Sequence, residues 1–281
     1  MLDPQWHSWI ADRLARGHAP GQLVAELERD GIPAGIASEA VRTALTGRPP
    51  TRAAAPAVAP RPAPPAFDCW PSAYPFHHRS EAVFEGQRVR QLMRLAQPSV
   101  ALLEGVLSPA ECEALIEAAR PQLERAEIVD PVTGVCRPDP ARASDGAPLD
   151  LAALAHLASI GPRLAWLMGS QPSHAETLQV LRYGVGGEYQ PHVDTFNVPS
   201  AAGGQRVATL VIYLRDVDRG GTTAFPELGL QVAPSCGMGI YFAYGDAQGR
   251  TDPRLLHAGM PLLGGEKWVA TQWVRDRPVM D

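Results

Sequence analysis

The sequence predicts a mainly β protein of the α+β class: a jelly-roll core backed by helices, with a small helical unit near the N-terminus. After Gln171, short β-branched and aromatic runs alternate with turn residues almost to the end of the chain, which is typical of a sandwich or barrel. The helical patterns of the main domain precede these runs, so we expect helices to cover one sheet. An Ala/Pro-rich stretch separates this core from the first helical segment.

The composition excludes several classes of protein. The 281 residues, 45% hydrophobic and 20% charged, suit a soluble globular protein of one large domain and a small appendage. A net charge of −5 and a pI near 5.9 argue against nucleic acid as the main partner. No run reaches the roughly 18 uncharged apolar residues of a membrane helix, and charged residues up to Arg16 argue against a signal peptide. The four cysteines are scattered without a C-x-x-C pair, which disfavours a zinc knuckle or disulfide framework and favours the cytoplasm.

In residues 1–46, apolar side chains recur at the spacing of amphipathic helices. They are Trp6, Ile10, Leu14, Leu23, Leu27, Val41 and Leu45. Gly17 and the Gly31-Ile32-Pro33 turn divide the segment into three short helices. Two roles are open: a module that docks a partner or presents substrate, and an appendage that packs on the main domain or tethers it.

Residues 47–66 are dominated by alanine and proline. Such a stretch cannot bury a core and favours polyproline II, so we expect an extended linker. A proline-rich substrate or recognition segment is the alternative. The main domain is then expected to span residues 67–281.

Two helices are expected early in the main domain. Ser108, Pro109 and Glu111 supply an N-cap, a proline at N1 and an acid at N3, which together predict a capping box. The stripe that follows includes Cys112, which we interpret as a core residue rather than a reactive thiol. The leucine spacing in residues 149–168 predicts the second helix.

A long loop is expected between these helices, and short strands after them. Residues 128–148 are rich in Pro, Gly, Asp and Arg and predict an exposed loop or irregular hairpin, of the kind that forms lids and binding loops. The expected strands are residues 178–183, 207–214, 222–225, 229–233, 238–244, 254–258 and 266–275.

His192 and Asp194 are separated by one residue, so on a β-strand their side chains project from the same face. His257 follows 257 − 194 = 63 residues later, far enough to lie on a different strand of the same barrel. Two histidines and one carboxylate on one face of a metal leave the opposite positions open, which is the ligand set of the non-haem Fe(II) oxygenases. Because an H-x-D pair alone occurs by chance in many chains, the flanking sequence decides.

The flanking sequence carries a series of landmarks in a fixed order. They are Tyr183, Gly186, Tyr189, His192, Asp194 and Phe196, then Arg206-Val207-Ala208-Thr209, Gly220-Gly221-Thr222-Thr223-Ala224-Phe225-Pro226, His257-Ala258-Gly259, Gly265-Glu266-Lys267-Trp268 and Trp273. From about Ser108 to Trp273 this succession resembles the prolyl 4-hydroxylase-like branch of the Fe(II)/2-oxoglutarate dioxygenases. The resemblance implies a double-stranded β-helix, a jelly-roll or cupin-like barrel, and does not cover the N-terminal unit and linker.

The resemblance also implies a metal centre. His192, Asp194 and His257 would hold Fe(II) and leave positions for the cosubstrates 2-oxoglutarate and O2. Asp194 argues against the related halogenases, which need that position vacated for chloride. A role for ascorbate in rescuing the oxidised metal is left open.

A cosubstrate site is implied next to the metal. Lys267 lies where the family has a basic residue that pairs with the distal carboxylate of 2-oxoglutarate. Tyr183, Thr223 and Trp273 would line the same pocket, with packing in the sheet as the alternative role for these three.

The implied substrate contacts are less well matched. Tyr189 and Arg206 occupy positions that face the peptide substrate in the resembled hydroxylases, and Arg142 begins an Arg-x-Ser element of a mobile loop that closes over substrate. Pro138, Asp139 and Pro140 crowd this loop and Cys136 lies within it, so substrate details carry over poorly.

The sequence therefore predicts an Fe(II)- and 2-oxoglutarate-dependent hydroxylase that acts on prolyl residues of a protein or peptide. One alternative is a hydroxylase of a free amino acid or small natural product. The other, from a different class, is a catalytically silent cupin-like barrel that stores metal or docks a partner.

Overall fold

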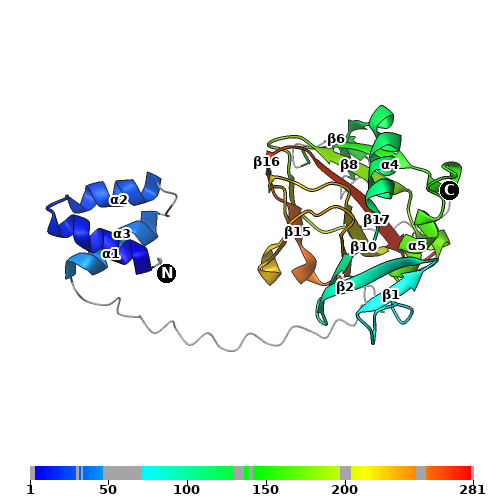
Figure 1. The fold of residues 1–281 in the computed structure, drawn as a ribbon, viewed down its shortest axis with the longest axis horizontal. Helices are drawn as coiled ribbons and strands as arrows, with labels where there is room; N and C mark the ends of the chain where they lie inside the picture. The colour runs from blue at the N-terminus through cyan, green and yellow to red at the C-terminus, as the bar shows by residue number, and fades with distance from the viewer. Residues whose placement is uncertain are drawn as a thin grey trace. The chain divides into compact units, whose positions relative to one another are not determined.

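The computed structural model describes residues 4–29, 32, 34–46, 71–129, 136–138, 142–196, 204–244 and 251–279. The chain divides into two compact units, Met1–Pro64 and Pro65–Asp281 (Figure 1). The predicted linker, residues 47–66, lies outside the described residues.

The N-terminal unit contains three helices, α1 (Pro4–Ala15), α2 (Pro20–Arg29) and α3 (Ala34–Thr46). Their apolar faces meet in a small core of Ile10, Leu23, Leu27, Ala37, Ala40 and Val41. Leu45, which the sequence pattern placed on the apolar face, is 55% exposed near the end of α3. No described helix has the length and apolarity needed to cross a membrane.

The second unit is built on a nine-stranded antiparallel sheet, here called the major sheet. Its strands in spatial order are β1 (Glu81–Phe84), β2 (Gln87–Leu95), β3 (Ser99–Glu104), β14 (Gly239–Ala243), β10 (Arg206–Tyr213), β17 (Lys267–Arg275), β8 (Leu178–Tyr183), β7 (Asp145–Leu149) and β4 (Glu124–Arg125). The long central strands are rich in β-branched and aromatic residues and are buried on both faces.

A four-stranded minor sheet packs against one face of the major sheet. It consists of β13 (Leu230–Val232), β12 (Thr223–Phe225), β15 (His257–Gly259) and β9 (Tyr189–His192). Side chains from both sheets, among them Tyr213, Phe225 and Phe242, form one buried cluster, the inter-sheet core. Two facing antiparallel sheets of this order confirm the double-stranded β-helix. Two short antiparallel strand pairs complete it: β11 (Arg219–Gly220) with β16 (Leu262–Gly264), and β5 (Glu127–Val129) with β6 (Cys136–Pro138).

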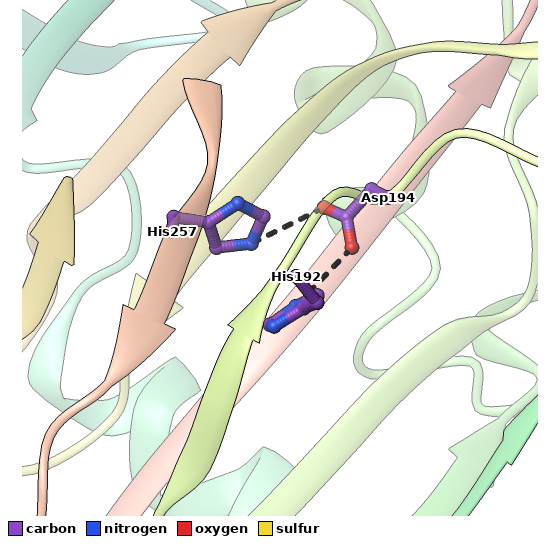
Figure 2. A group of neighbouring side chains, drawn as sticks. All are labelled: His192, Asp194 and His257. Carbon is purple, nitrogen blue, oxygen red and sulfur yellow. Dashed lines mark ion pairs between the residues drawn. The ribbon is translucent and has the colours of Figure 1, made fainter. Parts of the chain in front are cut away.

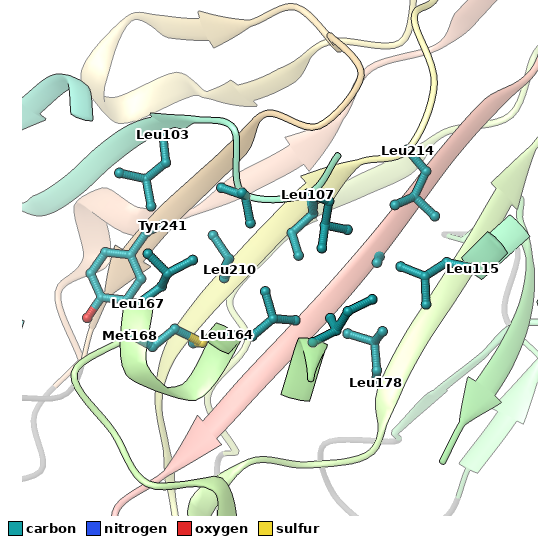
Figure 3. Packing of buried hydrophobic residues seen from close by; sticks show 14 of the residues in the cluster. Leu103, Leu107, Leu115, Leu164, Leu167, Met168, Leu178, Leu210, Leu214 and Tyr241 are labelled. Carbon is teal, nitrogen blue, oxygen red and sulfur yellow. The ribbon is translucent and has the colours of Figure 1, made fainter. Parts of the chain in front are cut away.

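Helices cover the opposite face of the major sheet, as predicted. α4 (Pro109–Ala119) begins with the expected capping box, in which the Ser108 hydroxyl accepts from the backbone N–H of Glu111. α4 and α5 (Ile160–Leu167) bury their leucines against alternate residues of the central strands to form the helix-side core (Figure 3). Cys112 lies in this core, and burial raises the pKa of its thiol to about 12, which agrees with a packing role.

Four sequence expectations were wrong in detail. Residues 149–168 do not form one helix: Leu149 ends β7, Asp150 caps a short 3₁₀ turn, and α5 begins only at Ile160. The exposed loop or irregular hairpin expected at 128–148 is confirmed in part by the antiparallel pair of β5 and β6, but β7 is an integral strand of the major sheet.

The other two incorrect expectations concern the positions of strands. Three strands, β1 to β3, precede the helices, and β3 pairs directly with β14. The strand expected at 254–258 starts only at His257, because Pro253–Leu255 forms a 3₁₀ turn in which the backbone N–H of Arg254 donates to the Asp252 carboxylate.

Candidate metal centre

The two histidines and the aspartate predicted as ligands lie together at one end of the minor sheet (Figure 2). His192 of β9 is the direct cross-strand partner of His257 of β15, and Asp194 follows β9 by two residues. Nε2 of His192 lies 3.6 Å from Oδ1 of Asp194, and Nε2 of His257 lies 3.6 Å from Oδ2. All three ligand atoms lie within 4.8 Å of one another. Ligands about 2.1 Å from one metal at right angles would lie roughly 3 Å apart, so small side-chain adjustments suffice to bind an ion.

Backbone carbonyls orient both imidazoles. Nδ1 of His192 lies 2.8 Å from the carbonyl oxygen of Gln190, and Nδ1 of His257 lies 3.0 Å from that of Leu255. A carbonyl can only accept, so each Nδ1 carries the proton and each Nε2 keeps its lone pair for a metal. Burial, and then the neighbouring His257, lower the pKa of His192 to about 3, so its ring is neutral and ready to coordinate.

Asp194 is the charged member of the group. Burial acts to raise its pKa, but His257, His192 and Arg206 outweigh burial, and the pKa falls below its usual value. The hydroxyl of Thr209 also donates to Oδ2 at 2.6 Å. Asp194 is therefore an ionised, oriented carboxylate beside two imidazoles whose Nε2 atoms face it, a donor set that fits Fe(II).

All of the sequence-predicted site residues except Arg206 line one open pocket. They are His192, Asp194, His257, Tyr183, Thr223, Lys267, Trp273, Tyr189 and Arg142. The strands of both sheets therefore bring together residues that lie up to 273 − 142 = 131 positions apart in the chain.

Lys267 is the basic residue of this pocket. It is 4% exposed, lies opposite Tyr183 in the β17–β8 ladder, and places Nζ 5.3 Å from the centre of the Tyr183 ring. Burial lowers its pKa to about 8, and no carboxylate within the described part of the chain pairs with it. Its cation thus has room for an anionic ligand.

Two further groups suit a polar ligand here. Nε1 of Trp273 is buried and has no hydrogen-bond partner among the described residues. The hydroxyl of Thr223 accepts a 2.8 Å hydrogen bond from Tyr213, so its own proton is free for another acceptor.

Tyr189 and Arg142 lie beside the metal ligands. The Tyr189 ring stacks on His192 with centroids 3.6 Å apart, and the guanidinium carbon of Arg142 lies 4.9 Å from the centre of the Tyr189 ring. Burial raises the pKa of Tyr189 to about 12, so its phenol stays protonated. Both side chains line the pocket beside His192.

Arg206 lies behind Asp194 instead of lining the pocket. Its guanidinium donates to both carboxylate oxygens of Glu176 at 2.8 and 2.7 Å and lies 4.0 Å from the centre of the Trp273 ring. Nη1 also donates to the backbone oxygen of Asp194 at 3.4 Å. Arg275 donates to the same Glu176 at 2.7 Å, so the charge of Arg206 is engaged within the protein.

Sequence reasoning missed Glu176, Thr209, Tyr213 and Tyr244. Thr209 had a usable signal, since a hydroxyl inside the apolar run 207–214 marks a buried polar position. The hydroxyl of Tyr213 in the same run is a weaker signal of a buried polar position. Tyr244 had none, because an aromatic residue at the end of an apolar strand is ordinary core composition.

Comparison with known proteins agrees with this geometry. Residues 178–275 match the family model of the 2OG-Fe(II) oxygenase superfamily. The chain is 36% identical over 199 residues to prolyl 4-hydroxylase 1 of Arabidopsis thaliana, covering 64% of this chain and 70% of that protein. It is 37% identical over 187 residues to prolyl 4-hydroxylase subunit alpha-1 of Mus musculus, covering 64% of this chain but only 35% of that subunit. The chain thus spans about a third of the length of such animal relatives.

Among solved structures, a similar one is the viral collagen prolyl hydroxylase of Paramecium Bursaria Chlorella virus-1 in its 2OG complex. The TM-score is 0.50 at 28% sequence identity, covering 62% of this chain and 94% of that one.

Proposed function

Because this chain belongs to the prolyl 4-hydroxylase-like branch of the 2OG-Fe(II) oxygenase superfamily, we propose that it is a 2-oxoglutarate-dependent hydroxylase of prolyl residues in a protein or peptide. One observation carries the proposal. A two-histidine, one-carboxylate group and the buried cation of Lys267 share a single pocket.

The metal-binding residues would be His192 and His257 through Nε2, and Asp194 through its carboxylate. Fe(II) held there would supply the activation of O2, with 2-oxoglutarate and a substrate C–H bond giving succinate, CO2 and the hydroxylated product. The ionised Asp194 balances part of the metal charge and occupies the position that a halogenase would leave for chloride.

The cosubstrate would lie between the metal and Lys267. The ammonium would pair with the distal carboxylate of 2-oxoglutarate, and the free proton of the Thr223 hydroxyl and the Nε1–H of Trp273 are available donors in the same pocket. Tyr183 supplies one wall. These groups orient the cosubstrate and exclude water from the reacting atoms.

The substrate would enter past Tyr189 and Arg142. Their stacked rings and guanidinium form a flat, rigid border beside His192, which suits the ring of a prolyl residue in an extended peptide. We also propose that ascorbate sustains turnover by reducing oxidised metal, and that the N-terminal helices dock the protein that carries the substrate.

The test is turnover by the full chain with Fe(II), 2-oxoglutarate and O2 in the presence of proline-containing peptides or free proline. We expect one succinate per hydroxylated product and a gain of about 16 Da, one oxygen atom, on a prolyl residue of the peptide. Asp194→Asn, nearly isosteric, should lose activity by about 10³-fold or more, because metal catalysis supplies several kcal/mol.

Two outcomes would contradict the proposal. Hydroxylation of free proline or another small molecule, with peptides untouched, would favour the small-substrate enzyme. Iron binding without succinate formation under any condition would favour a catalytically silent barrel.

A further inference from the structure

Two buried hydroxyl groups lie in a row behind the carboxylate of Asp194. The Thr209 hydroxyl donates to Oδ2 of Asp194 at 2.6 Å, and it lies 3.1 Å from the phenol oxygen of Tyr244. Thr209 belongs to β10, and Tyr244 directly follows β14, the antiparallel neighbour of β10. The backbone N–H of Tyr244 also bonds to the carbonyl of Val207 at 2.9 Å, so the sheet itself fixes the position of the phenol.

The chemistry of the groups determines the direction of each hydrogen bond. An ionised carboxylate only accepts, and a threonine hydroxyl has a single proton to donate. Since that proton goes to Asp194, the second bond must run from the Tyr244 O–H to the Thr209 oxygen. Tyr244 is completely buried, and burial together with nearby Asp194 raises its pKa well above the usual value, so the phenol keeps the proton it donates.

The two oxygens of Asp194 are therefore not equivalent. Each oxygen lies 3.6 Å from the Nε2 atom of one histidine, Oδ1 from His192 and Oδ2 from His257, but the short bond from Thr209 goes to Oδ2. A donor polarised by a second donor binds more strongly than an isolated hydroxyl, which draws charge toward Oδ2 and fixes the rotation of the carboxylate.

We propose that Tyr244 is a positioning residue for the metal centre: through Thr209 it orients the Asp194 carboxylate so that one oxygen remains for the metal. This extends the proposed function and rests on the metal site assigned there. Tyr244 does not touch the pocket, and it acts only through Thr209.

Packing alone does not account for this phenol. The Tyr244 ring sits beside Phe242 with centroids 6.0 Å apart, and phenylalanine would fill the same space. A buried hydroxyl without a partner costs about 1–3 kcal/mol, and among the described residues the partner of this one is Thr209. Its hydrogen bond to Thr209 is thus the feature that distinguishes it from a core aromatic.

The test is Co(II) binding to the metal-free full chain, without cosubstrate or oxygen, followed by calorimetry and by the visible absorption bands of bound Co(II). Removing a group that supports a metal ligand lowers metal affinity by roughly 10–100-fold. We expect a loss near the top of that range for Thr209→Val, a loss near the bottom for Tyr244→Phe, and altered band intensities in both. Thr209→Ser, which keeps the hydroxyl, should bind Co(II) like the unchanged protein.

The double variant decides whether Tyr244 acts through Thr209. If it does, adding Tyr244→Phe to Thr209→Val changes Co(II) affinity no further. Tyr213→Phe is the matched control, because this equally buried tyrosine donates to Thr223 and has no contact with Asp194; its Co(II) affinity should be unchanged.

Three results would overturn the proposal. The first is Co(II) binding by Tyr244→Phe as tight as that of the unchanged protein. The second is a loss of Co(II) affinity from Tyr244→Phe that is equally large in the Thr209→Val background. The third is a loss of Co(II) affinity in Tyr213→Phe as large as that in Tyr244→Phe. If Tyr244→Phe does not fold, equal affinities of Thr209→Ser and Thr209→Val overturn it instead. Failure of the unchanged protein to bind Co(II) would overturn the metal site itself, and with it the proposed function.

Discussion

The two faces of β10 differ although their residues alternate along one strand. On the helix side, Leu210 is fully buried in an apolar cluster with α4 and α5. On the other side, the neighbouring Thr209 donates to Asp194 and Tyr213 donates to Thr223. The helix-side core contributes stability through apolar contact, whereas the opposite face buries hydroxyls that orient the site. The pleat allows one strand to serve both purposes.

β17 shows the same contrast. Trp268 and Ala270 pack in the helix-side core, while Lys267 and Trp273 line the pocket. The pocket face buries a cation without an acid partner in the described part of the chain, so it holds a destabilising group that only a ligand can satisfy. Stability and function should therefore respond in opposite ways to substitutions on the two faces.

The largest effect on folding is expected on the helix side. Leu210→Ala should lower the free energy of unfolding by about 2–5 kcal/mol, because the Leu210 side chain is fully buried. Its Cδ1 packs closely against the backbone of Gly239, since a Cβ placed on that glycine would lie only 3.0 Å from it. Urea unfolding followed by circular dichroism measures it. Turnover per folded molecule should stay near that of the unchanged protein; a selective loss of turnover at full stability would break the contrast between the faces.

On the pocket face, Lys267→Met should weaken function and strengthen the fold. If Lys267 pairs with the distal carboxylate as proposed, its removal should raise the KM for 2-oxoglutarate by roughly 100-fold, the equivalent of a lost charge-assisted bond of about 2–3 kcal/mol. The metal-free variant should be more stable at pH 7 by up to about 3 kcal/mol, because burial lowers the Lys267 pKa from 10.5 to about 8. Lower stability at pH 7 would contradict this account.

The smallest expected effect is the pH dependence of 2-oxoglutarate affinity, which tests Lys267 as the cosubstrate anchor. Below pH 8 Lys267 is charged and affinity should be flat. Above the Lys267 pKa of about 8 the free protein loses the proton, so affinity should fall by up to tenfold per pH unit and each binding event should take up a proton. Calorimetry in buffers of different ionisation enthalpy measures the uptake. Affinity unchanged up to pH 10 would remove Lys267 as the anchor.

In the same pH range the metal-free protein behaves in the opposite direction. The folded pKa of Lys267 lies below its unfolded value, so between about pH 8 and 10.5 the unfolded chain binds the extra proton. Stability from this group therefore rises with pH across that window, while cosubstrate affinity falls.

The central strands could be predicted from sequence because they follow from local pattern: residues 207–214 and 266–275 read as strands from their own composition. The metal ligands and Lys267 were implied by the resemblance, which rests on the order and spacing of landmarks from Ser108 to Trp273. The three strands before α4 were missed, since β2 is a mixed polar segment in which only Val89 is buried, and it gives no clean alternation. Their place in the sheet depends on pairing with β14, more than 100 residues away.

Long-range pairing also explains the other failures. Residues 149–168 have leucines at helical spacing, yet Leu149 is held in β7 by its partner Leu178, so tertiary context overrides local propensity. Glu176 is an ordinary acid in the sequence. Its role follows from two arginines on different strands, Arg206 and Arg275, that reach it only in the folded sheet.

The position of His192 directly across from His257 has a consequence for the life of the protein. An ion held by both would tie two strands of only four and three residues, much as a cross-link does. A ligand that binds only the folded state stabilises it by about 2.7 kcal/mol at a hundred times its dissociation constant. Iron supply would then govern how long each molecule survives unfolding and proteolysis as well as how fast it turns over.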